Sequence, residues 1–223
     1  MDKRQVDLVR SLKATDRSEA GGKTISFKNT NGLVVGTLVP VDGRLINDQS
    51  LLVAFTSWRK EFKHNFLTQF EPTVARTKKW LSEVVLKDDA RVLFTIFDGD
   101  GKAVGHCGVC NIAEHQAELD NVLRGEKAGA PNFMFHAVTA VLSWLYQTLG
   151  VDRVVLHVFS NNEKAINLYK KLGFAETRRF NLSKIQDGED VRYLVSSQSG
   201  DPVDFYYLEM TLECSYFESG REI

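Results

Sequence analysis

An apolar segment followed directly by a short amphipathic one limits the possible folds most strongly. Residues 153–159 read Arg-Val-Val-Leu-His-Val-Phe, a nearly unbroken apolar run. Such a run is typical of a strand that is covered on both faces. Residues 162–172 follow with helical spacing, and Gly173 can take the left-handed conformation that often ends a helix. A strand and a helix in this order indicate an α/β domain.

Other periodic segments complete the expected set of elements. Helices are expected at residues 74–86, with a cap at Thr73, and at 133–149, and a further buried helical face is expected between Leu51 and Phe66. Strands are expected at residues 33–40, 91–97, 103–109, 117–123, 174–182, 191–195 and 205–212. Residues 1–32 are polar and irregular. We therefore expect one domain over residues 33–223, preceded by an extension to which no role is assigned.

The charge balance excludes several kinds of partner. The chain has 223 residues, with 28 Lys and Arg against 29 Asp and Glu, and a net charge of -1. No overall basic field is present to attract nucleic acid or an acidic membrane, so neither is expected as a partner. The apolar runs fall far short of the ~18 residues of a spanning helix, and the polar start lacks a secretory signal. We expect a cytoplasmic protein.

The cysteines predict no special chemistry. Cys107, Cys110 and Cys214 are odd in number, which fits a reducing compartment. Cys107 and Cys110 are spaced like a redox or zinc pair, but they lie within an expected strand, whereas a redox pair usually opens a helix. Zinc usually takes four ligands, and a second such pair is missing. We expect buried thiols and no metal site.

Residues 124–132, between an expected strand and an expected helix, form a candidate anion site. A helix start leaves free N–H groups beside the positive end of the helix dipole. Arg124 and Lys127 add positive charge. The small residues that let the backbone approach a diphosphate closely are Gly125, Ala128, Gly129 and Ala130. The patterns of the P-loop and of the dinucleotide fingerprint are absent.

The segment after the apolar strand resembles the Gcn5-related N-acetyltransferase (GNAT) superfamily. It carries the family's residues at the family's intervals, namely Asn162, Ala165, Tyr169, Gly173 and Phe174. The resemblance extends over residues 33–212. Segments around Trp58 and Trp80 are similar to the branch that acetylates protein N-termini, amino sugars and small amines.

This resemblance implies a fold and a donor. The implied fold is a mixed, mostly antiparallel central sheet with a splayed pair of strands and helices on both faces. The implied acyl donor is acetyl-CoA. The resemblance assigns to the cofactor residues of this loop, of the start of the helix that follows it, and of the motif after the apolar strand. They are Leu123, Arg124, Lys127, Ala128, Gly129, Ala130, Asn132, Phe133, Asn162 and Ala165.

The loop departs from the family pattern of Gln or Arg, two residues, Gly, one residue, then Gly or Ala. The register that best fits the helix places Lys127, Ala130 and Asn132 at these positions. A register that starts at Arg124 places Lys127 and Gly129 there instead. Neither matches fully, so both stay open and the detailed loop contacts are not predicted.

The resemblance also suggests catalytic roles. Tyr169 stands where the family has a phenol near the departing sulfur of CoA, which makes it the candidate general acid. An amine acceptor must first lose a proton, a task that suits a carboxylate. Glu118 and Asp120 share one face of their strand by alternation, and Asp120 is preferred because it is nearer the expected splay point. Backbone N–H groups near Leu123 would polarise the thioester carbonyl.

The sequence therefore predicts transfer of an acetyl group to a primary amine of a small metabolite, such as an amino sugar or a sugar nucleotide. A peptide or protein N-terminus is the alternative acceptor. A non-catalytic acyl-CoA-binding protein is the alternative from another class, which the degenerate loop favours. The expected partner is a small-molecule amine, and a homodimer is compatible with this hypothesis.

Overall fold

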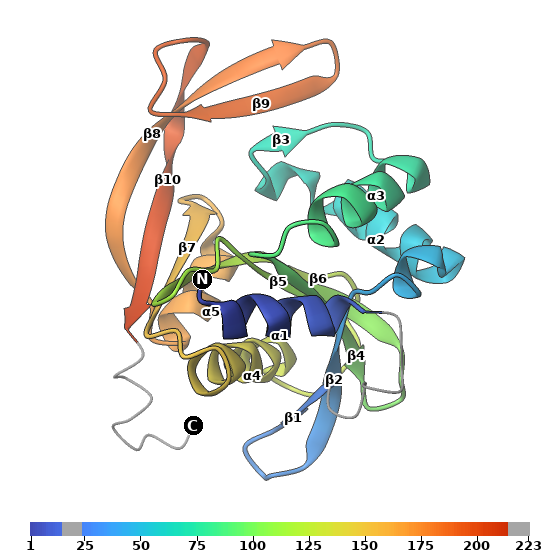
Figure 1. Cartoon of the computed structure of the whole chain (residues 1–223). Coiled ribbons are helices and arrows are strands. Elements are labelled where there is room, and N and C mark those ends of the chain that lie inside the picture. Colours follow the sequence, from blue (N-terminus) through green and yellow to red (C-terminus); the bar gives the residue numbers. More distant parts are fainter. Residues whose placement is uncertain (15–23, 214–223) are drawn as a thin grey trace.

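The computed structural model describes residues 1–14 and 24–213, and within them ten strands form one sheet in the order β1-β2-β4-β5-β6-β7-β10-β8-β9-β3 (Figure 1). Paired strands are antiparallel except β6 and β7, which are parallel. The predicted mixed, mostly antiparallel sheet is confirmed. The strands are β1 (Ile25–Lys28), β2 (Val34–Pro40), β3 (Thr68–Gln69), β4 (Val92–Asp98), β5 (Ala103–Cys110), β6 (Gln116–Arg124), β7 (Arg153–Phe159), β8 (Ala175–Asp187), β9 (Asp190–Val195) and β10 (Asp201–Glu213).

Four of the five described α-helices begin at residues whose side chains accept a hydrogen bond from a free backbone N–H group. Thr73 accepts a hydrogen bond from the N–H of Arg76 at 3.2 Å, and Asn162 accepts one from Ala165 at 3.2 Å. The helices are α1 (Lys3–Lys13), α2 (Gln49–Glu61), α3 (Val74–Trp80), α4 (Phe133–Gln147) and α5 (Glu163–Lys171), with the short turns η1 (Leu45–Asn47), η2 (Lys63–Asn65) and η3 (Leu81–Val85). The helix expected at residues 74–86 is thus split, because η3 is a π-helical turn.

Two buried clusters cover the two faces of the sheet. The larger, the α4-side core, joins α1, α4 and α5 to the sheet and includes Phe133. The smaller, the α2-side core, joins α2 and η3 to it and includes Phe55. Neighbouring residues of β4 alternate between them, since Leu93 belongs to the α2-side core and Phe94 to the α4-side core. Figure 1 shows α1 and α4 together on one side of the sheet, away from α2 and α3.

Residues 1–14 and 24–32, which the sequence analysis set apart as an extension, pack in the structure against the same core as the rest of the chain. Val9 of α1 is fully buried in the α4-side core. The side chain of Gln5 donates a hydrogen bond to the carbonyl of Leu149 at 2.8 Å. Strand β1 pairs with β2, so Phe27 stands opposite Gly36 in the sheet. A boundary between residues 32 and 33 would therefore cut a hairpin of the central sheet.

A one-residue bulge in β6 reverses which side chains face each core. Gly108 pairs with Asp120 and His106 pairs with Leu123, so β6 carries one residue more than β5 between the two pairs. Asn121 absorbs this residue with a φ of 50°, and its carbonyl accepts a hydrogen bond from Nδ1 of His106 at 2.6 Å. Leu119 packs in the α4-side core, whereas Leu123 packs in the α2-side core. The alternation is therefore out of phase on the two sides of the bulge.

The parallel strands β6 and β7 separate at this bulge. Their pairing runs from Gln116 opposite Arg153 to Leu119 opposite Leu156 and stops there. Beyond that point the edge of β6 that faces β7 has no partner among the described strands, so alternate backbone groups on it can bind a ligand. The splayed pair of strands that the resemblance implied is present.

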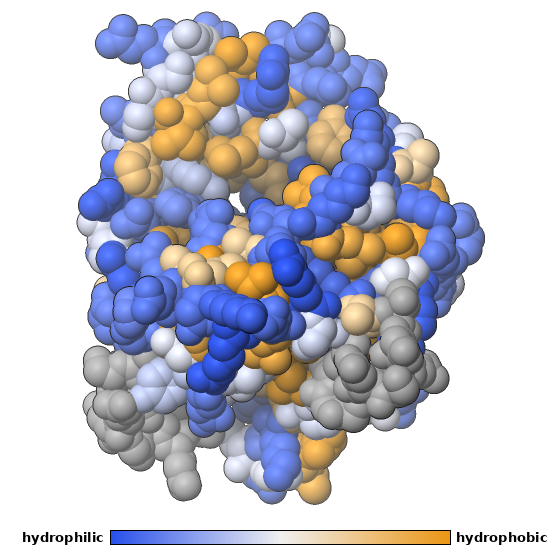
Figure 2. All heavy atoms as spheres, viewed as in Figure 1, coloured by the Kyte–Doolittle hydropathy of each residue, from blue (hydrophilic) through white to orange (hydrophobic). Residues whose placement is uncertain are grey.

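The last three strands form a long antiparallel unit that extends past the rest of the sheet, as Figure 1 shows. Strand β9 pairs with β3, because Thr68 stands opposite Arg192 and Gln69 opposite Val191. The short segment between α2 and α3 is thereby tied to the tail of the chain. Figure 2 shows apolar side chains gathered on the upper part of this face, beside a hollow in the surface. None of the helices described has the length and apolar character needed to cross a bilayer.

Candidate active site

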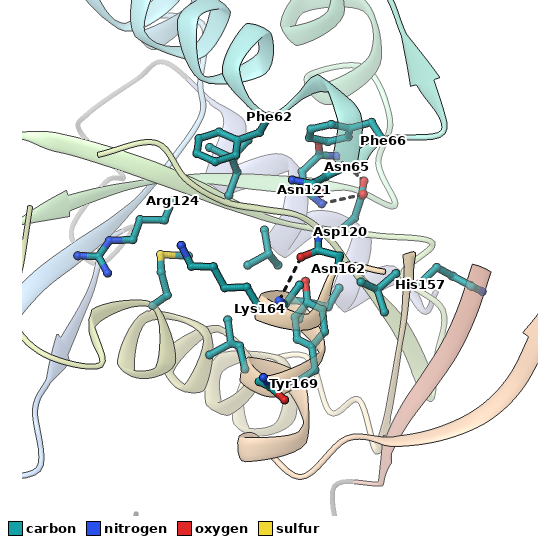
Figure 3. A pocket seen from close by; sticks show the side chains of 18 of the residues that line it. Phe62, Asn65, Phe66, Asp120, Asn121, Arg124, His157, Asn162, Lys164 and Tyr169 are labelled. Atoms are coloured by element: carbon teal, nitrogen blue, oxygen red, sulfur yellow. Dashed lines mark hydrogen bonds between the residues drawn. The ribbon is translucent and has the colours of Figure 1, made fainter. Parts of the chain in front are cut away.

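A cavity of about 720 Å³ lies where β6 and β7 separate. Its walls come from the end of α2 and the segment up to β3, from β6 and β7, from the start of α4, from α5, and from Tyr207 on β10. Figure 3 shows Phe62, Asn65 and Phe66 on one side of β6 and Tyr169 on the other. Segments that are far apart in the sequence therefore converge on one space.

The structure brings most of the predicted site residues to this cavity, though not all. Those that line it are Asp120, Leu123, Arg124, Asn132, Phe133, Asn162, Ala165 and Tyr169. The four predicted residues in the middle of the anion loop do not line the cavity, namely Lys127, Ala128, Gly129 and Ala130. The loop thus meets the cavity at its two ends.

The conformation of Asn132 favours one of the two loop registers. Asn132 precedes α4 with a left-handed φ of 56°, a conformation that suits Gly best and that Asn tolerates better than most residues. Asn therefore fits a position where the family pattern has a small residue, as the register of Lys127, Ala130 and Asn132 requires. Its side chain does not cap α4 but accepts a hydrogen bond from Lys171 at 3.0 Å. The first N–H groups of α4 are left without a side-chain cap, as an anion site requires.

Two further contacts shape this loop. Gly129 has a φ of 96°, and a Cβ atom there would lie 2.6 Å from the ring of Phe133. Arg124 donates hydrogen bonds to the carbonyls of Glu126 at 3.0 Å and Ala128 at 2.8 Å. The guanidinium of Arg124 therefore holds the loop in shape, which was not part of the sequence prediction. Lys127 is exposed.

Tyr169 is buried at the cavity wall. Its side chain lies on α5, is 7% exposed, and meets the ring of Phe174 edge to face at 6.0 Å. Burial raises the pKa of the phenol, with the negative groups around it adding to the effect. The hydroxyl therefore stays protonated at neutral pH, which is the state that a general acid needs.

Asp120 is held by other side chains of the protein. One carboxylate oxygen accepts hydrogen bonds from Arg91 at 2.7 Å and from the side chain of Asn121 at 2.6 Å, and the other accepts one from the N–H of Asn121 at 2.7 Å. These contacts support the bulge and the separation of the strands. Protein donors thus occupy three of the about four acceptor positions of this carboxylate.

A second carboxylate at the cavity, Glu118, pairs with a histidine that sequence reasoning missed. Its Oε1 lies 2.8 Å from Nδ1 of His157, and its Oε2 accepts a hydrogen bond from Asn111 at 2.7 Å. The ring of Tyr207 stacks on His157 at 5.2 Å, and Glu209 lies 3.7 Å from its Nε2. The polar position of His157 within an apolar strand was the available signal.

The pair changes the proton affinities of both partners. The hydrogen bond to Glu118 raises the pKa of His157, although burial opposes it. Burial acts to raise the pKa of Glu118, but the hydrogen bonds from His157 and Asn111 outweigh it and the net pKa is lowered. The geometry resembles that of a base oriented by a carboxylate.

The cysteines are structural where the structure describes them. Cys107 and Cys110 are buried free thiols on β5, and burial raises the pKa of both. Cys214 lies outside the described residues. Among the residues described, no group of three or more His, Cys, Asp or Glu side chains is placed to hold a metal ion.

Comparison with known proteins identifies the class. A family model described as "Acetyltransferase (GNAT) domain" matches residues 45–175, which is more than half of the chain. The chain belongs to the GNAT acetyltransferase family, and the acetyl group that it transfers comes from acetyl-CoA. No curated protein sequence matches the chain significantly.

Solved structures share the fold. Spermidine N-acetyltransferase from Vibrio cholerae, in complex with CoA and spermine, aligns with a TM-score of 0.62 at 16% identity, covering 82% of this chain and 98% of that one. A probable GNAT-family acetyltransferase from Chromobacterium violaceum aligns with a TM-score of 0.64 at 12% identity, covering 87% and 88%. At such identities the likeness concerns the architecture.

Proposed function

We propose that this enzyme acetylates the primary amine of a small molecule. The observation that carries the proposal is the meeting, in one cavity, of a buried phenol and a carboxylate-histidine pair beside the separated strands. A volume of about 720 Å³ lies in the range of small-molecule sites. The pairing of β3 with β9 ties the cavity wall at Thr68 to the tail of the sheet, which favours a small acceptor over a polypeptide. The structural neighbour from Vibrio cholerae is named for spermidine, itself a small amine.

The residues of the site fit acetyl-CoA. When bound, acetyl-CoA supplies the activated acetyl group as a thioester. The uncapped start of α4 and the shaped loop before it would hold the diphosphate through backbone N–H groups. The free edge of β6 beyond Leu119 would bind the pantetheine arm and polarise the thioester carbonyl near Leu123.

We assign acceptance of the amine proton to the Glu118 and His157 pair, whose two residues line the cavity. His157 takes the proton on Nε2 while Glu118 stabilises the resulting imidazolium through Nδ1. Tyr169 donates a proton to the departing sulfur. In this scheme Asp120, which the sequence analysis preferred as the base, holds Arg91 and the bulge residue Asn121 in place through hydrogen bonds.

A thiol-release assay with a panel of amines tests the function. The panel contains a polyamine, an amino sugar, an amino-sugar phosphate, an amino acid and a peptide with a free N-terminus. Release of CoA with one of the small amines supports the proposal. Release with the peptide alone would assign the enzyme to the alternative acceptor class. CoA binding without release for any amine would indicate an acyl-CoA-binding protein.

A further inference from the structure

Arg59 is held on the acceptor wall of the cavity. It lies in the last turn of α2, and it is one of the residues that line the cavity. Its guanidinium carbon lies 3.5 Å from the centre of the Phe66 ring. Its Nη2 donates a hydrogen bond to the carbonyl of Thr68 at 2.8 Å. These contacts fix a planar cation between α2 and β3.

This cation lacks the carboxylate partner that several other arginines of the chain have. Arg91 pairs with Asp120 at 2.7 Å and Arg179 with Glu176 at 2.9 Å, whereas Arg59 forms no ion pair with any described carboxylate. The charge of Asp120 acts on it at longer range, and burial lowers the pKa of Arg59 to about 10. A partly desolvated charge without a counter-ion is costly to the free protein.

The unused donors of Arg59 suit one kind of ligand group. A guanidinium carries five N–H donors in a rigid fork that matches the oxygens of a carboxylate or a phosphate. The bond to Thr68 occupies one of these donors. An anionic oxygen group in the cavity would satisfy others and neutralise the charge.

We propose that Arg59 forms an anion subsite for the acceptor, so that the preferred amines carry a carboxylate or phosphate group as well as the amine. This inference rests on the proposed function, because it extends the acceptor half of the same cavity. CoA also carries phosphates, and its predicted anchor is the start of α4, on a different wall of the cavity. Separate measurements for the donor and the acceptor therefore distinguish the two sources of the anion.

The test uses amines that differ only in an anionic group. One pair is an amino sugar and its phosphate, and the other is an amino acid amide and the free amino acid. The affinity of each amine is measured by equilibrium titration of CoA-saturated protein, which needs no turnover. The wild type should bind one of the anionic members about 10- to 100-fold more tightly than its neutral partner, as hydrogen bonds between charged groups allow. The pair that shows the preference tells a phosphate acceptor from a carboxylate acceptor.

Variants then assign the preference to Arg59. Arg59→Gln should abolish the preference and leave the affinity for the neutral amines and the KM for acetyl-CoA within about twofold. Arg59→Lys keeps the charge but loses the fork, and it should retain part of the preference. Arg76→Gln is the matched control, because Arg76 also stacks on a ring, that of Phe70, yet does not line the cavity. Its preference should equal that of the wild type.

The outcomes separate this inference from the proposed function. Equal binding of both members of each pair by the wild type would overturn the anion subsite even if every amine is acetylated. A change in the KM for acetyl-CoA alone in Arg59→Gln would assign Arg59 to the donor and overturn it as well. Failure of every amine in the thiol-release assay would overturn the function, while the titration would still decide whether the cavity has an anion subsite.

Discussion

Nδ1 of His157 lies 2.8 Å from Oε1 of Glu118, and the two residues come from the parallel strands β6 and β7. Glu118 stands opposite Val155 in the register, and His157 is two residues further along, so both side chains project from the same face. The pair is therefore built by the strand pairing itself, just before the strands separate.

The proposed base, His157, can be tested by substitution. His157→Gln should lower kcat/KM at neutral pH by about 10²- to 10³-fold, because general bases contribute on this scale. The gap to the wild type should narrow as the pH approaches the pKa of the amine, where the acceptor loses its proton unaided. A pH profile of kcat/KM checks this. A deficit that stays constant with pH would show that His157 does not accept the proton.

Asp120→Asn provides the contrasting profile. This change weakens the contacts with Arg91 and Asn121 but leaves the Glu118 and His157 pair in place. We expect a profile parallel to that of the wild type, lowered at every pH. Recovery of this variant at alkaline pH would instead make Asp120 the base, as the sequence predicted.

The pair should also make stability depend on pH. The pKa of His157 is raised from 6.5, so its stabilising effect is complete below about 6.5 and is lost as the pH rises through the folded value. The pKa of Glu118 is lowered from 4.5, so its effect is complete above about 4.5 and is lost as the pH falls through the folded value. The pair therefore stabilises the protein most between these two values.

Thermal unfolding of Glu118→Gln tests this window. At pH 5.5 the variant should lose about 1.5 kcal/mol, or about 3–6 °C in Tm for a chain of this size. The loss should be smaller at pH 8.5. Glu83→Gln is the control, because Glu83 is half exposed and only 4.0 Å from Lys79, and its Tm should hardly change. The same loss at both pH values would contradict the expected linkage.

Tyr169→Phe should separate turnover from binding. The lost hydroxyl acts only when charge develops on the sulfur, so kcat should fall about 10²-fold while the KM for acetyl-CoA stays within about threefold. Steady-state kinetics measure both. Tyr206→Phe, at an exposed position of β10, should have the activity of the wild type. An unchanged kcat in Tyr169→Phe would reduce this residue to packing against Phe174.

The anion loop is tested by titration with CoA. Gly129→Ala forces a Cβ into the ring of Phe133 at a positive φ, so the affinity for CoA should fall at least about tenfold. Gly101→Ala has a similar φ of 76° but an open surrounding, and it should bind CoA like the wild type. The wild type should also bind CoA more tightly than pantetheine, which lacks the diphosphate. Equal affinities would exclude the diphosphate as the anchor.

Sequence patterns predicted the elements with strong periodicity. The apolar strand β7 and the capped helix α5 were predicted nearly to the residue, because both signals are local. Strand β1 was missed because four residues within a polar region carry too little pattern, and pairing with β2 is what makes them a strand. The split of the helix at Leu81 was missed because π-helical turns are rare single turns within α-helices, and the helical spacing of apolar residues does not indicate them.

The site was predictable only where its residues are close in sequence. Asn162 and Tyr169 lie within one motif. Glu118 and His157 are 39 residues apart, and their contact depends on a strand register that no local pattern specifies. Arg59 was passed over because a basic residue near the end of a helix is ordinary until the cavity beside it is known.

The bulge at Asn121 gives β6 one residue more than β5 just beyond the point where β6 and β7 stop pairing. The separation of β6 and β7 therefore depends on the number of residues in β6 and not on the identity of one side chain. Substitutions can change the residues that line the cavity without changing this count. Deletion of one residue at the bulge would move the following side chains of β6 to the opposite face of the sheet. Changes of the lining that keep the backbone count leave the architecture intact, which is consistent with a fold shared at only 12–16% identity.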